Sequence, residues 1–179
     1  MAQAMRRGRM TRVQKTLFVM GAALTLIGAS LAIHSDPLFV WNASASVPIG
    51  FYAITPNEHP KVGDLVAVRP PESLETWLVE NRYLGPSTPF LKHIAALPGT
   101  EVCRDGAVIL IDGDAIAEAR ERDRLDRPLP VWNGCHRLAD GEVFFLNADH
   151  PASLDGRYFG PLSDKTIIGQ ATPLWTRGD

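Results

Sequence analysis

The feature that most constrains this chain is a long uncharged segment close to its N-terminus. The 20 residues between Lys15 and Asp36 include no Asp, Glu, Lys or Arg, and 17–33 is a dense apolar run. A helix of this length spans about 30 Å, the thickness of the hydrocarbon layer of a bilayer. The pattern predicts a single transmembrane anchor over 16–35. A core helix of a soluble protein is disfavoured because the segment has no amphipathic stripe.

The charges are distributed unevenly around this segment. Residues 1–15 carry a net charge of +5, whereas the remainder of the chain carries −7. Basic residues stay on the cytoplasmic side of a membrane, so we expect 1–15 in the cytoplasm and the body 36–179 in the periplasm, at a bacterial inner membrane. Small residues at 29–33 leave a cleavable signal sequence as the alternative to a retained anchor. The acidic body argues against a nucleic-acid partner, because phosphate contacts need clustered Lys and Arg.

Composition and turn residues predict a mainly β body. The chain contains 15 Gly and 14 Pro, and short apolar runs bounded by such residues are typical of strands. One helix is expected over 73–84, with Ser73 as its N-cap. The charged segment 117–127 is expected to be a short exposed helix or a mobile loop that serves as a solvated connector. We expect strands at 51–55, 64–68, 91–96, 108–111, 142–146 and 166–175.

Two cysteines, Cys103 and Cys135, fall in the part of the chain that is expected to be exported. An even number of cysteines outside the cytoplasm favours one disulfide, and two free thiols are the alternative. A zinc site is disfavoured because neither cysteine belongs to a C-x-x-C pair. No metal, nucleotide or organic cofactor is implied.

The first chemically suggestive pattern is Asn-Ala-Ser-Ala-Ser-Val-Pro-Ile-Gly-Phe-Tyr at 42–52. Ser44 and Ser46 alternate there, and Pro48 and Gly50 interrupt regular structure before a strand begins. A serine on such a turn presents its hydroxyl and the neighbouring N–H groups. Taken alone, the pattern is also typical of a serine-rich linker after a membrane anchor.

The second pattern places Lys92 inside the apolar run Phe-Leu-Lys-His-Ile-Ala-Ala-Leu-Pro-Gly at 90–99. Desolvation disfavours the charged form of lysine and lowers its pKa. The neutral amine is then a proton acceptor of the kind that a serine nucleophile needs. Taken alone, Lys92 also fits an edge strand from which its amine reaches water.

The third pattern is a loop at 147–161 that is rich in side chains able to bond locally. Asp155 and Arg157 can form an ion pair, and Ser153 can orient another group. A purely structural turn closed by the ion pair is the alternative.

Taken in this order, the three patterns resemble the type I signal peptidases. The resemblance is carried by a Ser-x-Pro segment, a Leu-Lys-x-x-x-x-Leu-Pro-Gly strand and a Ser-x-Asp-x-Arg-Tyr-Phe-Gly loop, and it covers roughly 40–175. The 42–52 segment and the compact size are similar to the conjugative-transfer signal peptidase of the TraF type. The resemblance implies a signal-peptidase-like antiparallel β-sheet body with one or two short helices. It also implies a membrane-bound serine endopeptidase that cleaves signal or pro-peptides of exported proteins, in particular pro-pilin of a conjugative transfer system, with peptide cyclisation as a further outcome.

The resemblance gives roles to the residues of the first two patterns. Ser46 matches the nucleophile and Lys92 matches the general base. Ser44 matches the serine whose hydroxyl joins the Ser46 N–H in the oxyanion hole. Pro48 and Gly50 match residues that shape the turn carrying the nucleophile.

The resemblance also gives roles to the third pattern, which departs from the family in two places. Ser153 matches the serine that orients the lysine amine, and Asp155 and Arg157 match an ion pair that braces the site, with Asp155 kept as a candidate catalytic residue. Gly156 stands where a serine is often found, and Asn-Ala-Asp-His at 147–150 replaces a Gly-Asp-Asn-Arg stretch.

The sequence is also compatible with other functions. A general leader peptidase for secreted proteins is the nearest, and it differs in its substrates. A self-cleaving repressor uses the same pair of residue types but is cytoplasmic and carries a DNA-binding domain. A non-enzymatic, membrane-anchored assembly factor needs neither Ser46 nor Lys92. The expected partners are a pre-protein substrate and the membrane.

Overall fold

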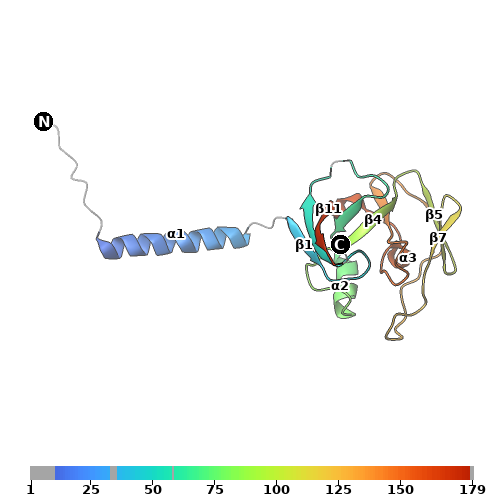
Figure 1. Ribbon diagram of the computed structural model, residues 1–179, viewed down its shortest axis with the longest axis horizontal. Coiled ribbons are helices and arrows are strands. Elements are labelled where there is room, and N and C mark those ends of the chain that lie inside the picture. The colour runs from blue at the N-terminus through green and yellow to red at the C-terminus, as the bar shows by residue number, and fades with distance from the viewer. Residues whose placement is uncertain (1–10, 33–35, 58, 178–179) are drawn as a thin grey trace. The chain divides into compact units, whose positions relative to one another are not determined.

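The computed structural model describes residues 11–32, 36–57 and 59–177, and the chain divides into two compact units between Asp36 and Pro37 (Figure 1). The first unit contains helix α1 (Arg12–Ala32), which includes most of the apolar run. The predicted basic segment up to residue 10 and the predicted end of the anchor at 33–35 lie outside the described residues. No helix within the described residues has the length and apolar character required to cross a bilayer.

The larger sheet of the second unit has seven strands in the described residues. Its order is β1-β2-β11-β3-β4-β9-β10, and each neighbouring pair is antiparallel. The strands are β1 (Phe39–Asn42), β2 (Gly50–Thr55), β3 (Leu65–Val68), β4 (Phe90–Ala96), β9 (Glu142–Phe145), β10 (Leu162–Ser163) and β11 (Ile167–Thr176).

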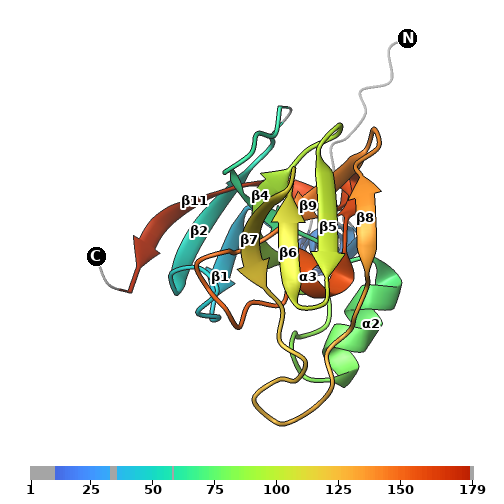
Figure 2. The same ribbon diagram turned by 90° about the vertical axis from the view of Figure 1, so that its right-hand side faces the viewer.

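A smaller sheet and three short helices complete the described body. The small sheet has the order β7-β6-β5-β8, again antiparallel. Figure 1 shows helix α3 between β4 of the large sheet and the small sheet, and Figure 2 shows it behind β5 and β6. The elements are β5 (Glu101–Asp105), β6 (Val108–Ile111), β7 (Asp114–Glu118), β8 (Gly134–Arg137), α2 (Glu72–Glu80), α3 (Gly156–Phe159) and a 3₁₀ turn, η1 (Asp164–Thr166).

The prediction of a mainly β body is confirmed. Each predicted strand is present, with ends that differ by at most one residue. The sequence did not reveal β1, β5, β7, β8 or β10. The side chains of β7 and β8 are mostly exposed and show no apolar alternation. The predicted cap of α2 is wrong: the helix begins at Glu72 with Pro71 as its N-cap, and it ends before Arg82, whose φ is 59°. Proline before a first helical turn costs no hydrogen bond.

The buried side chains form clusters on both sides of the large sheet, and one cluster joins the two sheets. In that cluster Val102 and Ile109 of the small sheet pack with Phe144 of β9. Strand β4 lies between β3 and β9, so it is an interior strand. This position excludes the edge-strand interpretation of Lys92. The cluster under β1, β2 and β11 contains Val40, Val47, Tyr52, Ile54, Ala67, Leu91 and Ala171.

Cys103 and Cys135 form a disulfide between β5 and β8, at directly opposed positions of the small sheet. Their separation of 32 residues closes the long segment that includes β6, β7 and the loop between β7 and β8. The favoured disulfide of the sequence analysis is therefore present.

We expect the double variant C103S/C135S to unfold more easily than the parent chain. A cross-link that closes a loop of this length contributes about 3–4 kcal/mol in the chain-entropy account. Denaturant unfolding followed by tryptophan fluorescence, with the parent chain under reducing conditions as a second sample, measures this difference. Equal free energies of unfolding for the variant and the oxidised parent would contradict a stabilising role.

Candidate active site

The side chain of Asn42 shapes the loop that carries the two serines. Asn42 at the end of β1 pairs with Gly50 at the start of β2, so residues 43–49 form the connecting loop. The Asn42 Nδ2 group donates to the carbonyl oxygens of Ser44, Val47 and Pro48, at 2.8, 3.1 and 3.0 Å. Its Oδ1 accepts from the backbone N–H and the hydroxyl of Ser44, at 3.2 and 3.1 Å. One buried amide therefore fixes both ends of the loop.

The two serine hydroxyls of this loop lie within hydrogen-bond distance of each other. Ser44 Oγ and Ser46 Oγ are 2.9 Å apart. Ser44 is exposed and Ser46 is half-buried, so both hydroxyls are accessible to a ligand. The Pro48 carbonyl also accepts a 2.6 Å hydrogen bond from the Tyr52 hydroxyl, which ties the loop to the core.

Gly50 is required by a close approach between strands rather than by its own backbone angles. A Cβ atom at Gly50 would lie 2.1 Å from the carbonyl oxygen of Trp175 and 2.8 Å from the Cα of Thr176. A side chain there would push β11 away from β2 and move the base of the serine loop.

Lys92 is buried on β4, with 4% of its surface exposed. Its amine donates a 2.9 Å hydrogen bond to Ser153 Oγ, and Ser153 is 2% exposed. The Phe90 ring, two residues earlier on the same strand face, lies 5.5 Å from the amine. The long separation of 61 residues between Lys92 and Ser153 is thus bridged in the folded protein.

Burial lowers the pKa of the Lys92 amine from 10.5 to about 8, because the charged form is poorly solvated inside the protein. The nearby Asp155 carboxylate raises this pKa and the Arg157 guanidinium lowers it, both less than burial does. At neutral pH about a tenth of the molecules then carry an uncharged amine at this position. That fraction is far larger than for a lysine in water.

Asp155 and Arg157 form a buried ion pair behind Ser153. The Arg157 Nε and Nη2 atoms donate to the two carboxylate oxygens of Asp155, at 2.9 and 3.1 Å, and each residue is 1% exposed. The backbone N–H groups of Asn147 and Arg157 donate to the same carboxylate. Arg157 Nη2 also donates to the carbonyls of Asn147 and His150. The pair therefore holds the 147–153 loop that presents Ser153.

Asn147 was not assigned a role from the sequence, and the structure gives it one. Its Oδ1 accepts from the backbone N–H of His93 at 3.0 Å, and its Nδ2 donates to the carbonyl of Leu91 at 3.3 Å. These two residues flank Lys92 on β4. Asn147 stands where the Gly-Asp-Asn-Arg stretch begins with Gly. Its side chain thus joins β4, which carries Lys92, to the loop that carries Ser153. The sequence feature that could have identified Asn147 is its position as a polar residue directly after the predicted strand at 142–146.

The second departure, Gly156, also has a structural reason. A Cβ at Gly156 would lie 2.6 Å from the Phe144 ring and 2.6 Å from the carbonyl oxygen of Phe145. The indole N–H of Trp132 donates to the Gly156 carbonyl at 3.0 Å. The Phe144 ring occupies the space that a serine side chain would need.

One cavity of about 830 Å³ brings together the two serines of the first pattern, the lysine of the second and the serine of the third. Ser46, Lys92 and Ser153 all line it. The described hydrogen bonds join Ser46 to Ser44 and Lys92 to Ser153, and none joins Ser46 to Lys92. Asp155, Arg157, Pro48 and Gly50 are not among the lining residues. Gly50, Asp155 and Arg157 are buried, whereas Pro48 is exposed on the serine loop.

We expect Asn42→Ala to impair any activity of this site by about tenfold to a hundredfold, because small misplacements of reacting groups have effects of that size. The variant leaves three carbonyls without their shared donor and frees the Ser44 hydroxyl. Steady-state kinetics on a cleavable peptide measures the loss, which should fall on kcat. The control Asn133→Ala removes an exposed amide outside the cavity. Equal rates for both variants would show that the loop needs no such support.

Comparison with known proteins identifies the family of this chain. The family described as Signal peptidase, peptidase S26 matches residues 10–175 of the chain. Conjugal transfer protein TraF of Agrobacterium fabrum is 31% identical over 147 residues, which cover 75% of this chain and 81% of that protein. Plasmid transfer protein TraF of Escherichia coli is 28% identical over 166 residues, covering 87% and 91%. Probable signal peptidase I-1 of a Synechocystis species is 32% identical over 112 residues, covering 63% and 53%.

A solved structure of a signal peptidase I from Enterococcus faecalis V583 aligns with a TM-score of 0.39 and 19% identity, covering 64% of this chain and 98% of that one. The family match spans almost the whole chain, so this protein belongs to the signal peptidase family S26. Within that family it is similar both to proteins named for conjugal or plasmid transfer and to one named as a signal peptidase. The resemblance found in the sequence is confirmed.

Proposed function

We propose that this protein is a serine endopeptidase that uses Ser46 as its nucleophile and Lys92 as its general base. The observation that carries the proposal is the buried amine of Lys92, with a pKa near 8, in the same cavity as Ser46. A lysine retained in the interior of a sheet is costly unless its neutral form has a use. Because the chain belongs to a peptidase family, the use that we propose for the neutral amine is that of a general base in peptide cleavage.

In the proposed reaction the Ser46 oxygen attacks a peptide carbonyl while its proton moves to the neutral Lys92 amine. The Ser153 hydroxyl holds this amine in position. A bond forms between Ser46 Oγ and the carbonyl carbon, and the carbonyl oxygen becomes negatively charged. The Ser46 N–H and the Ser44 hydroxyl stabilise that oxygen, and one such donor is worth about 3 kcal/mol.

The second half of the reaction releases the two products. The protonated Lys92 gives its proton to the departing amine as the C–N bond breaks, which leaves an ester between the substrate and Ser46. Water then attacks the ester and regenerates Ser46. If an amine of the same substrate attacks instead, the product is a cyclic peptide. Asp155 acts in this scheme as a positioning residue, because its carboxylate is occupied by Arg157 and Asn147.

The proposed substrates are signal or pro-peptides of exported proteins, with pro-pilin of a conjugative transfer system first. The relatives named for conjugal and plasmid transfer support this choice. We further propose that 16–35 anchors the protein in the inner membrane and that the body lies in the periplasm. The uncharged segment with its basic flank supports the anchor.

An exposed aromatic surface supports a position of the body next to lipid. The Phe39 and Phe51 rings stack at 5.5 Å and the Trp41 and Trp175 rings at 6.0 Å, although each ring is more than a third exposed. Tryptophan rings such as those of Trp41 and Trp175 are enriched at membrane interfaces. Strand β1, which carries Phe39 and Trp41, begins a few residues after the proposed anchor.

The deciding experiment is processing of a co-expressed pro-pilin, read on a gel and by mass spectrometry of the product. The parent chain should convert the precursor, and S46A and K92A should not. S73A and K165A are matched controls, since both residues are exposed and lie outside the cavity. Undiminished processing by S46A or K92A would overturn the proposal and favour a non-enzymatic assembly factor. Conversion of a general secretory precursor but not of pro-pilin would identify a leader peptidase.

Mass spectrometry also separates the two chemical outcomes, because a cyclic product is lighter than the linear one by one water. Fractionation of the same cells into membrane and soluble parts tests the anchor. Recovery of the active protein from the soluble periplasm would show that the segment is removed.

A further inference from the structure

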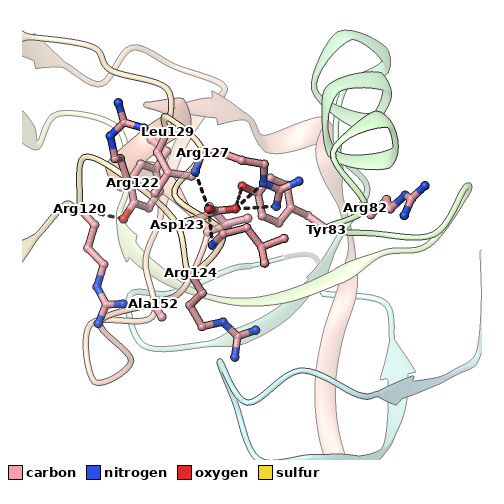
Figure 3. A pocket seen from close by; sticks show the side chains of 12 residues that line it. Arg82, Tyr83, Arg120, Arg122, Asp123, Arg124, Arg127, Leu129 and Ala152 are labelled. Atoms are coloured by element: carbon pink, nitrogen blue, oxygen red, sulfur yellow. Dashed lines mark hydrogen bonds and ion pairs between the residues drawn. The ribbon is translucent and has the colours of Figure 1, made fainter.

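A second, smaller cavity opens beside the proposed catalytic one and is rich in arginine. It has a volume of about 230 Å³, and the loop at 119–129, between β7 and β8, provides most of its wall. Five of its lining residues are arginines and one is an aspartate (Figure 3). The sequence predicts a short exposed helix or a mobile loop over 117–127. In the structure the helix is absent: 117–118 end β7 and the residues that follow form a loop.

The loop is fixed by the single acidic residue of the cavity. Asp123 accepts a 2.6 Å hydrogen bond from the Tyr83 hydroxyl and one of 2.7 Å from Arg127 Nε, and it also accepts from two backbone N–H groups of its own loop. Arg127 donates in turn to the Asn81 carbonyl, and its guanidinium lies over the Tyr83 ring. The network ties the loop to the segment after α2, and the bonds to Asp123 are drawn with dashed lines in Figure 3.

Two of the five guanidinium groups are therefore already used. Arg127 neutralises Asp123, and Arg122 pairs with Asp126 at 3.5 Å. The side chains of Arg82, Arg120 and Arg124 have no hydrogen-bond or ion-pair partner among the described residues. In Figure 3 the Arg82 side chain points away from the others, whereas Arg120 and Arg124 flank Ala152. The cavity thus presents two uncompensated positive charges.

These charges adjoin the proposed catalytic groove. Tyr83, Arg124, Ala152 and Leu154 line both cavities. Ala152 directly precedes Ser153, whose hydroxyl accepts from the Lys92 amine. A peptide bound in the larger cavity therefore has a direct route to Arg124 and Arg120, along a wall that also contains Leu129 and Tyr158.

We propose that Arg120 and Arg124 bind a carboxylate of the substrate peptide, a few residues from the bond that is cut. The inference rests on the proposed peptidase function, because the ligand is a part of that substrate. Guanidinium groups form strong charge-assisted hydrogen bonds with carboxylates. The rest of the body is acidic, so this site is a local exception that attracts an acidic segment to one end of the groove. The carboxylate belongs either to an Asp or Glu side chain or to the C-terminus of a short peptide.

The test uses peptides with a single Glu that is moved one position at a time along the peptide, each paired with its Gln analogue. The parent enzyme should cleave one Glu peptide with a kcat/KM about tenfold above its Gln analogue. R120Q/R124Q should remove this preference, so that the Glu peptide and its Gln analogue are cleaved with the same kcat/KM. R177Q is the matched control, since Arg177 is exposed and lines neither cavity. Peptides with a free and an amidated C-terminus distinguish a terminal carboxylate from a side-chain one.

The outcomes separate this proposal from the proposed function. The carboxylate site is refuted if the parent enzyme prefers neither Glu at any position nor a free C-terminus. It is also refuted if a preference survives in R120Q/R124Q. In both cases the proposed peptidase function is unaffected. Weaker binding of R120Q/R124Q to vesicles with anionic lipid, together with unchanged peptide selectivity, would assign the arginines to a membrane surface and overturn the proposal. If the parent chain cleaves no peptide, binding of the same peptides to S46A by calorimetry still tests the site. Equal affinities for Glu and Gln peptides would then refute it.

Discussion

Replacement of Lys92 by methionine is expected to abolish peptide cleavage, with a loss of more than about a thousandfold in kcat/KM. Methionine keeps a flexible apolar side chain of similar length, so the cavity on β4 remains filled while the proton acceptor is removed. Cleavage of a fluorogenic peptide measures the loss, and K165M is the control at an exposed site. A residual rate close to that of the parent chain would show that another group accepts the Ser46 proton.

The same lysine sets the expected pH dependence of the parent enzyme. Only the uncharged amine accepts a proton, and the pKa of Lys92 is lowered to about 8 by burial. The value of kcat/KM should therefore rise with pH and level off above about pH 8. A profile that rises near pH 6 instead would point to a histidine as the base.

Lys92→Met is also expected to increase the free energy of unfolding at neutral pH. The unfolded chain binds a proton at this lysine below about pH 10.5, whereas the folded chain does so only below about pH 8. The parent chain is therefore destabilised at low and neutral pH, and the penalty is relieved as the pH rises between these values. At neutral pH the free energy of unfolding of K92M should exceed that of the parent chain by roughly 3 kcal/mol. The loss of the hydrogen bond to Ser153 reduces this gain. Denaturant unfolding at neutral and alkaline pH measures this difference in the free energy of unfolding, which should become smaller as the pH rises.

Arg157→Met is the second change with a large expected effect, on stability and on the site together. It leaves the Asp155 carboxylate buried without its main partner, and breaking such a pair costs about 3–5 kcal/mol. The unpaired carboxylate also favours the charged form of Lys92, so the pH profile of cleavage should move to higher pH. Thermal unfolding and a pH–rate profile measure the two effects, with R177M as the control.

A double variant separates the ion pair from the packing around it. D155L/R157M removes both charges, so no unpaired charge of this pair remains buried, and its loss of stability should be smaller than that of R157M. A larger loss in the double variant would mean that the pair itself stabilises the loop. In either case the hydrogen bonds from Arg157 to the carbonyls of Asn147 and His150 are lost, and Ser153 should become less well positioned.

The sequence indicated the main parts of the site because their chemistry is local. A lysine in an apolar run and alternating serines before a proline are visible without a fold, and the strands at 90–96 and 142–145 follow from apolar runs between turn residues. The supporting amides were not visible. The role of Asn42 depends on three carbonyls of its own loop, and that of Asn147 depends on a strand more than 50 residues away.

The arginine cavity was missed for a related reason. The charged stretch at 117–127 has the composition of a solvated connector, and only the fold brings its Asp123 to a tyrosine 40 residues away. That contact decides which arginines are paired and which are not. Composition predicts the number of charges on a segment, but the partners of those charges depend on tertiary structure.

The disulfide between β5 and β8 has a consequence for the timing of maturation. Thiols stay reduced in the cytoplasm and become oxidised after export. A newly made chain that is delivered to the periplasm, as we propose, therefore gains its cross-link only on arrival. The small sheet would then become fully rigid in the periplasm, where the substrates emerge. A copy that stays in the cytoplasm would lack the disulfide and would be degraded more readily.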